Sequence, residues 1–170
     1  MSRTANLLGA VALLAADRMR DATGAELSTS AALVTLQTMA DGGSIDELRR
    51  VLGLSHSGGV RVVQSLRRGG LVTQERDPAD GRAVRLRLTD AGHQAARRIR
   101  QARLETLDAL LGDLGPDGRG ELDGLLADIL GGATGGRAAA RQICRLCDPD
   151  VCGHPDTCPV TLAADDRIAS

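Results

Sequence analysis

The chain has 170 residues and a formal net charge of −1, and it contains no lysine and no aromatic residue. A chain of this length forms one domain, or one domain with a small appendage, and its near-neutral charge by itself predicts no polyanionic partner. The lack of aromatic side chains argues against proteins that bind RNA or single-stranded DNA, because those proteins stack bases on aromatic rings.

The charges are unevenly distributed along the chain. Residues 45–88 hold nine arginines and five acids, a net charge of +4, whereas residues 104–135 hold one arginine and seven acids, a net charge of −6. A basic segment followed by an acidic one is typical of a protein with a nucleic-acid face and a separate solvated face.

Residues 4–22 are predicted to form an amphipathic helix, because Leu7, Val11 and Leu14 recur about one turn apart. The apolar run 5–16 also resembles the core of a signal peptide, in which case the protein would be exported and its cysteines would form disulfides. The run is too short to span a bilayer. We therefore interpret it as a helix of a cytoplasmic protein that has no membrane partner.

Three shorter helices are predicted next, each preceded by a serine that can cap it. They run from Ser28 or Ser30 to about Ala40, from Ser44 to Leu52, and from Ser55 or Ser57 to about Arg68. Ser44 and Glu47 also have the spacing of a capping box, in which each residue satisfies a backbone N–H of the other.

The pattern then changes from helical to extended. Residues 71–76 and 83–88 are short, alternating or β-branched segments on either side of the turn sequence D-P-A-D-G, so they predict a β-hairpin. Two helices with leucine stripes follow, over 89–114 and 117–130, the first of them capped by Thr89.

Two short helices joined by a tight turn and followed at once by a hairpin indicate a winged helix-turn-helix. The predicted fold class is mainly α (α+β), with dimerisation helices on both sides and a small C-terminal Cys-rich module. The expected units are an N-terminal dimerisation helix (1–28), a DNA-binding domain (29–88), C-terminal dimerisation helices (89–132) and a metal-binding tail (137–170). The flanking helices carry broader apolar stripes than so small a domain could cover, which favours a homodimer.

The second helix of the pair would enter the major groove of double-stranded DNA by its N-terminal turn, where the helix end favours phosphate. Gly58 and Gly59 would let the backbone approach the DNA closely, and an arginine at the hairpin tip suits the minor groove. Alternatively, the hairpin arginines are solvated or paired with Asp77 and Asp80. The predicted DNA-contacting residues are Ser55, His56, Ser57, Gly58, Arg61, Arg76, Arg82 and Arg85.

Two stretches, L-G-L-S-H-S-G-G-V-R-V-V-Q-S-L-R-R-G-G-L-V and E-R-D-P-A-D-G-R-A-V-R-L-R-L-T-D-A-G, resemble the MarR family of bacterial transcriptional regulators. The resemblance covers about residues 5–132. It implies a homodimer that reads a pseudo-palindromic operator, usually under the control of a small phenolic or oxidant effector. It also implies that Asp80 braces the wing or the recognition helix and that Arg82 enters the minor groove. Where the family often has Thr or Ser before the recognition-helix arginine, this chain has Val60 before Arg61.

All the cysteines lie within fifteen residues, beyond a glycine-rich segment (131–136) that is predicted to be a flexible joint. Their spacing is C-x2-C-x4-C-x5-C, at Cys144, Cys147, Cys152 and Cys158, with His154 as a possible substitute ligand. A structural zinc site is the first expectation, an iron–sulfur cluster the second, and a metal-free thiol switch the third. Inert thiols would leave the clustering unexplained. The segment has too few apolar residues to fold by burial alone, so a cross-link is expected.

The sequence therefore predicts a dimeric, sequence-specific DNA-binding regulator, acting as a repressor, with a metal site in its tail. The alternatives are a redox-sensing or iron–sulfur-sensing regulator that uses the cysteines as its switch, and a metal-binding adaptor that does not bind DNA. No enzyme is predicted, because the sequence lacks G-x-S-x-G, H-E-x-x-H and phosphate-loop motifs. The C-R-L-C motif also lacks the βαβ context of a thiol oxidoreductase.

Overall fold

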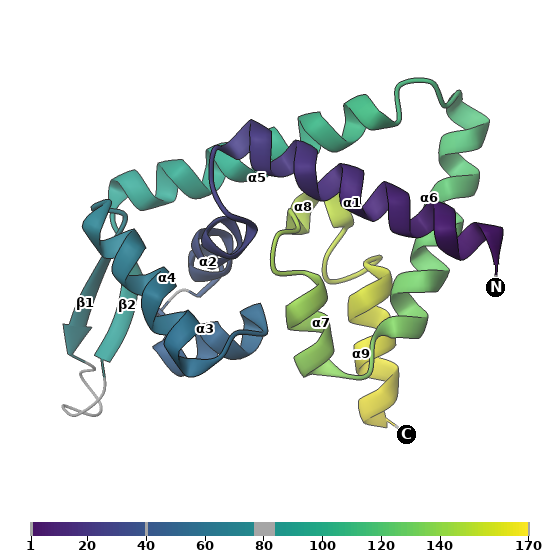
Figure 1. The fold of residues 1–170 in the computed structure, drawn as a ribbon. Helices are drawn as coiled ribbons and strands as arrows, with labels where there is room; N and C mark the ends of the chain where they lie inside the picture. The colour runs from purple at the N-terminus through teal and green to yellow at the C-terminus, as the bar shows by residue number, and fades with distance from the viewer. Residues whose placement is uncertain (1, 40, 77–83, 170) are drawn as a thin grey trace.

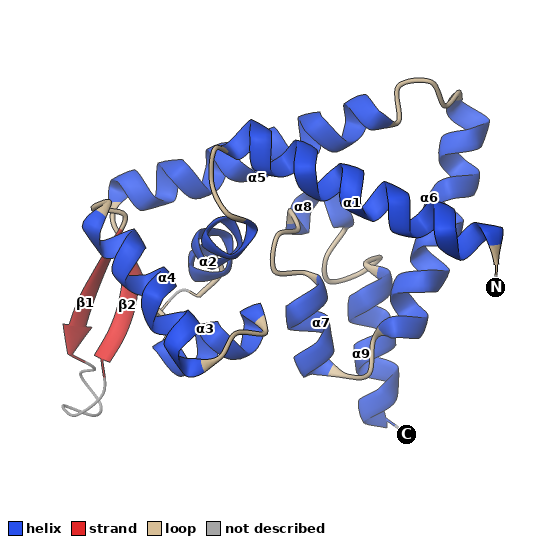
Figure 2. Cartoon of the chain, viewed as in Figure 1, coloured by secondary structure: helices blue, strands red, loops and turns tan. Residues whose placement is uncertain are grey.

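A computed structural model describes residues 2–39, 41–76 and 84–169 of the chain. The elements are α1 (Arg3–Thr23), α2 (Leu27–Gln37), α3 (Ile45–Leu52), α4 (His56–Arg68), β1 (Val72–Arg76), β2 (Val84–Leu88), α5 (Asp90–Leu110), α6 (Pro116–Ala133), α7 (Arg137–Ile143), α8 (Pro149–Cys152) and α9 (Pro159–Ala169). The described chain is mostly helical with one small antiparallel sheet (Figure 2), which confirms the predicted fold class. Within these ranges, no helix is long and apolar enough to cross a bilayer.

The long helices α1 and α5 pack against each other and connect the two ends of the molecule (Figure 1). At one end lie α2–α4 and the β1–β2 hairpin, which we call the winged domain. At the other end α6 descends beside α9. We call α7–α9 the tail. The tail lies between α6 and the winged domain, and α7 packs on both α3 and α9.

The hydrophobic core surrounds α2, the most deeply buried helix. α2 packs on α3, α4, α5 and β2, and it has the near-continuous burial expected of a helix enclosed on all sides. Aliphatic residues alone build this core, because the chain has no aromatic side chain. The buried core residues include Leu33, Val34, Leu36, Leu48, Val63, Leu66, Val72, Leu86, Ala96 and Ile99.

The hairpin is held against the start of α5 by the sequence L-T-D-A-G. Thr89 Oγ1 caps α5 by accepting a hydrogen bond from the Gly92 N–H (3.1 Å), and the same hydroxyl donates to the Gly70 carbonyl (2.7 Å). A Cβ at Gly92 would lie 2.1 Å from the Leu71 carbonyl oxygen, so only glycine permits this approach. The strands pair antiparallel from Val72 opposite Leu88 to Arg76 opposite Val84. The predicted turn at the tip of the hairpin, with Asp77, Asp80 and Arg82, lies outside the described residues.

The capping box predicted at the start of α3 is present. Ser44 Oγ accepts from the Glu47 N–H (3.1 Å), and the Glu47 carboxylate accepts from the Ser44 N–H (2.9 Å). The hydrogen bond from the Ser44 backbone lowers the pKa of Glu47 below its ordinary value of 4.5. The charged carboxylate therefore stabilises the fold above pH 4.5, and this contribution is lost as the pH falls through the lowered pKa.

Replacing this cap is expected to have a pH-dependent cost. Ser44→Ala should lower the free energy of unfolding by about 1 kcal/mol at neutral pH, because it leaves an N–H of the first turn without its partner. The cost should shrink once Glu47 is protonated, since half of the reciprocal pair is then already weakened. Urea unfolding of both proteins, at neutral pH and in acid, measures this. An equal cost at both pH values would contradict the reciprocal arrangement.

Three predicted helix ends are wrong. The serine cap of α2 is absent: the helix begins at Leu27 after Glu26, whose side chain makes no capping bond, and Ser30 is buried. The long helix α5 ends at Leu110, short of the predicted 114. The helix α6 continues through Ala133, beyond its predicted end at residue 130, so only residues 134–136 of the glycine-rich segment lie between α6 and α7. The tail forms three helices, α7 to α9, and these helices and their connections bury Leu146, Cys158, Val160 and Ala164.

Candidate DNA-binding surface and cysteine cluster

The helix-turn-helix is formed by α3 and α4, which pack directly on each other. A Cβ at Gly59 would lie 2.9 Å from Arg49 Cβ and 3.7 Å from Ile45 Cγ2, so Gly59 is the point where α4 approaches α3. The prediction that both Gly58 and Gly59 serve the approach to DNA is therefore wrong for Gly59, which is buried against α3. A contact of Gly58 with DNA stays a prediction.

The N-terminal turn of α4 is exposed and contains no acidic residue. Ser55 caps the helix by accepting from the Gly58 N–H (3.1 Å), and its hydroxyl lies 3.2 Å from that of Ser57. Both serines are exposed, and so are His56 and Arg61. The structure thus brings together the predicted contact residues of α4 on one accessible helix end, where backbone N–H groups favour phosphate.

The wing carries the remaining predicted contacts. Arg76 is exposed at the end of β1. Arg87 pairs with Glu75 across the hairpin (3.0 Å), and Arg85 donates to the Asp41 carbonyl (3.3 Å), so both also have structural partners. Arg82 and Asp80, the wing residues that the family resemblance singles out, lie outside the described residues and stay predictions.

Two exposed arginines at the C-terminal end of α4, Arg67 and Arg68, are not among the contacts predicted from the sequence. They line an open depression of about 630 Å³ together with Gln64, Thr73 and Gln74, beside β1. Because they continue the exposed surface of α4 toward the wing, they are further candidates for contact with the DNA backbone. Their position within the basic segment 45–88 was the available signal.

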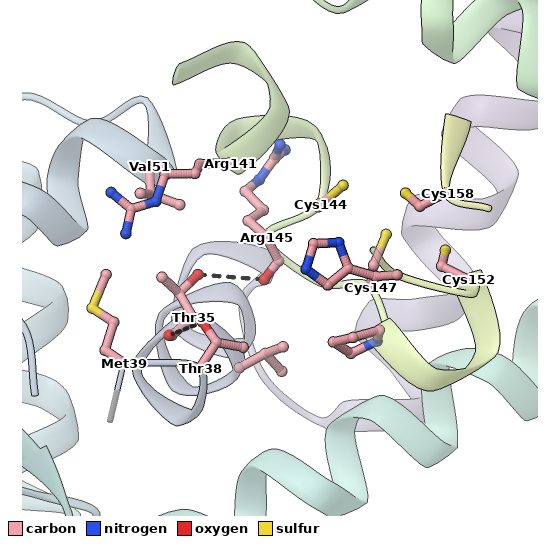
Figure 3. A pocket seen from close by; sticks show the side chains of 13 residues that line it. Thr35, Thr38, Met39, Val51, Arg141, Cys144, Arg145, Cys147, Cys152 and Cys158 are labelled. Atoms are coloured by element: carbon pink, nitrogen blue, oxygen red, sulfur yellow. Dashed lines mark hydrogen bonds between the residues drawn. The ribbon is translucent and has the colours of Figure 1, made fainter. Parts of the chain in front are cut away.

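The four cysteines gather around one cavity of about 340 Å³ between the tail and the winged domain (Figure 3). Their sulfur atoms lie on one side of it, and the opposite wall is formed by Thr35 of α2, Met39 just after α2 and Val51 of α3. All four are free thiols. His154 also lines the cavity, and its Nδ1 lies 2.8 Å from Thr161 Oγ1.

Contacts between the thiols give them different acidities. A hydrogen bond from Cys144, supported by the nearby Arg103 and Arg145, outweighs burial and lowers the pKa of Cys147 to about 6. The same hydrogen bond raises the pKa of Cys144, whereas burial and the charge of Cys147 raise that of Cys152 to about 11. Burial opposes ionisation of Cys158, but hydrogen bonds from Thr161 and Val160 lower its pKa.

The described residues include no group of three or more His, Cys, Asp or Glu side chains arranged to hold a metal ion. The four sulfurs nevertheless border one cavity, and each sits on a side chain with a single heavy-atom torsion. A metal site would therefore require these side chains to move from their described positions, and rotation about this torsion is one way to do so. Donors of this type, four thiolates in a short segment, suit zinc.

The tail is attached to the winged domain by polar and apolar contacts. Gln142 Nε2 donates to the Arg50 carbonyl in the last turn of α3 (3.0 Å), and Thr35 Oγ1 of α2 donates to the Arg145 carbonyl (3.4 Å). Leu146 is 9% exposed and belongs to the core that surrounds α2. On α5, Arg100 lies 3.8 Å from Asp148. The tail therefore folds against its own chain.

An exposed helix end on a helix-turn-helix, next to a two-stranded wing, defines the class of winged-helix DNA-binding proteins. Residues 25–83 match the family model described as "MarR family". This match confirms, over the winged domain, the resemblance inferred from the sequence. No curated protein matches the chain.

Solved structures show the same fold. Wild-type MarR from E. coli, in its apo form, is 20% identical and has a TM-score of 0.66, with 76% of this chain and 98% of that chain covered. CouR from Rhodococcus jostii RHA1 bound to p-coumaroyl-CoA is 21% identical, with a TM-score of 0.62 over 75% and 92% of the two chains. A mutant of S. aureus MepR bound to an oligodeoxyribonucleotide is 16% identical, with a TM-score of 0.57 over 76% and 97%. About a quarter of this chain has no counterpart in them.

Proposed function

We propose that this protein is a homodimeric transcriptional repressor that binds a pseudo-palindromic site on double-stranded DNA, and that its four cysteines hold one zinc ion per chain. The observation that carries the DNA-binding part of this proposal is the N-terminal turn of α4, which is exposed, contains no acidic residue and lies next to the wing. The solved structure of MepR contains an oligodeoxyribonucleotide, which supports duplex binding by this fold.

The charge of the surface supports DNA as the partner. Arg61, Arg67, Arg68 and Arg76 are all exposed on α4 and β1. Arginines on such a surface displace counterions from the DNA backbone, which makes binding strongly salt-dependent. An adaptor that used the same surface for a protein would show no salt-dependent binding to duplex DNA.

Arg61→Ala is expected to weaken duplex binding about tenfold, because it removes a cation from the second turn of the recognition helix. The measurement is fluorescence anisotropy with a duplex that covers the region upstream of the protein's own gene, repeated over a series of salt concentrations. If Arg61 contacts a phosphate, the slope of log affinity against log salt should also fall by about one per contact.

Arg167→Ala is the matched control, since it removes the same charge from an exposed position on α9, remote from the winged domain. Its affinity should equal that of the unmodified protein. Equal losses in the two variants would indicate a general charge effect, and no loss with Arg61→Ala would remove this residue from the interface. A run-off transcription assay on the same duplex distinguishes repression from activation.

The dimer is supported by apolar side chains that this chain leaves uncovered. α1 buries none of its residues fully, and its Leu7, Leu8, Val11, Leu13 and Leu14 are 45–71% exposed. On α6, Leu125, Leu126 and Ile129 are 39–61% exposed. Both helices reach the end of the molecule opposite the wing (Figure 1). A patch of this kind marks an interaction surface, and a second copy of the chain is the occupant we propose.

Zinc is supported by the number and kind of donors. Four free thiols border one cavity, and the thiolates that they can form are the ligands that bind metal. When bound, zinc would act as a structural cross-link. The tail residues around it would then keep their positions, with Thr161 orienting His154 by the contact at Nδ1.

A further inference from the structure

The two residues between the first pair of cysteines join the tail to the winged domain. The Arg145 carbonyl accepts a hydrogen bond from Thr35 on α2, and the Leu146 side chain is buried in the core. Leu146 also lines a small cavity with Met19 of α1, Leu27 of α2 and Ile99 of α5. Any change in the conformation of the Cys144–Cys147 segment therefore acts directly on the packing of α2.

The segments on either side of the cysteines reach two other parts of the molecule. Before them, α7 contacts α3 through the hydrogen bond from Gln142 to the Arg50 carbonyl. After them, α9 packs along α6, which carries part of the exposed apolar surface. The cysteine cluster therefore lies on a second connection between the proposed dimer surface and the helix-turn-helix, in addition to α5.

We propose that zinc binding by the cysteine cluster controls DNA affinity, because it fixes the position of the winged domain relative to α6 through Arg145 and Leu146. This inference rests on the proposed function, since it requires both duplex binding and metal binding. A dimer reads two half-sites only when its two winged domains have the right separation and orientation.

We expect zinc to strengthen DNA binding, because it orders the tail before the protein meets DNA. With zinc bound, the cysteines, α7 and α9 form one cross-linked unit, and the winged domain is held in place before DNA arrives. Without zinc, the tail gains freedom, and DNA binding must order it again at a cost in free energy. The zinc-loaded dimer should therefore bind its site more tightly. By linkage, the duplex should raise the affinity for zinc by the same factor.

The test uses the full-length, reduced protein in anaerobic buffer and a duplex that it selects from a random-sequence library. Anisotropy titrations of zinc-loaded and chelator-stripped protein should give dissociation constants that differ about tenfold, with the loaded protein the tighter binder. Equal affinities, or tighter binding by stripped protein, would overturn the inference. Failure of both forms to select any duplex would instead overturn the proposed DNA-binding function.

Two variants test whether Arg145 and Leu146 connect the zinc site to the winged domain, and both variants keep all four thiols. Thr35→Val removes the hydrogen bond to the Arg145 carbonyl with little change of shape, and Leu146→Ala removes the buried side chain. Both should still bind one zinc per chain, and both should bring the ratio of the two dissociation constants close to one. Gln101→Ala, an exposed change on α5, should keep the full ratio. If both variants bind zinc and keep the full ratio, the proposed route is wrong.

Discussion

Val11→Asp is expected to convert the dimer into monomers and to weaken operator binding by about 100-fold or more. Val11 is 57% exposed on α1, so a charge there should leave the fold of the single chain unchanged. In a dimer, the same charge would be buried in an apolar interface without a partner. A dimer that places two winged domains on two half-sites binds roughly 10²–10⁴-fold more tightly than a single winged domain on one half-site. A monomer loses this gain.

Light scattering after gel filtration measures the mass, and anisotropy measures the affinity for the operator. Ile168→Asp is the matched control, because Ile168 is 59% exposed and lies on α9 rather than on α1. This variant should stay dimeric and keep its affinity. A Val11→Asp protein that remains dimeric would exclude α1 from the interface, whereas a monomer with full affinity would remove the need for a dimer.

Cys147→Ser is expected to abolish zinc binding and to release the tail from the winged domain. The unmodified protein, purified anaerobically, should be colourless and contain one zinc per chain. A structural zinc site contributes roughly 10 kcal/mol to the folding of a small module. Without it, the contacts at Gln142, Arg145 and Leu146 must hold the tail alone, so the tail should open far more often.

Limited trypsin digestion measures this opening, since Arg141 and Arg145 lie in the attached segment. Cleavage there should be at least about 100-fold faster in Cys147→Ser, because each 1.4 kcal/mol changes the open population tenfold. Val151→Ser, an exposed change in α8, should retain both zinc and protection. A brown protein that contains iron would favour the cluster instead of zinc. If the purified protein contains no metal and its tail already resists trypsin, zinc and the cluster are both excluded, and the thiol switch is the remaining interpretation.

Much of the winged domain follows from short sequence signals. Three helices start at predicted capping residues, which are Ser44 (with Glu47), Ser55 and Thr89. Each capping hydroxyl acts on a backbone group only three residues away. The hairpin likewise follows from two alternating segments beside a strong turn sequence. Such signals are local, so one sequence is enough to detect them.

The errors occur where distant segments decide the outcome. The sequence predicts that Gly59 lets the backbone approach DNA, but its lack of a side chain is required by Arg49 and Ile45 of the neighbouring helix. Residues 131–133 continue α6 in spite of two glycines, since packing of α9 on α6 compensates for their low helix propensity. In both cases the reason lies in a residue that is close in space but not in sequence.

The order of the helices, the hairpin, the basic segment and the clustering of Cys144–Cys158 are all local properties, and periodicity, capping and spacing are sufficient to infer them. The docking of the tail depends on tertiary structure. Thr35 and Arg145 are 110 positions apart, and Arg50 and Gln142 are 92 apart. Only the packed chain brings the cysteines against the winged domain, because burial of Leu146 and these hydrogen bonds offset the entropy of closing so long a loop.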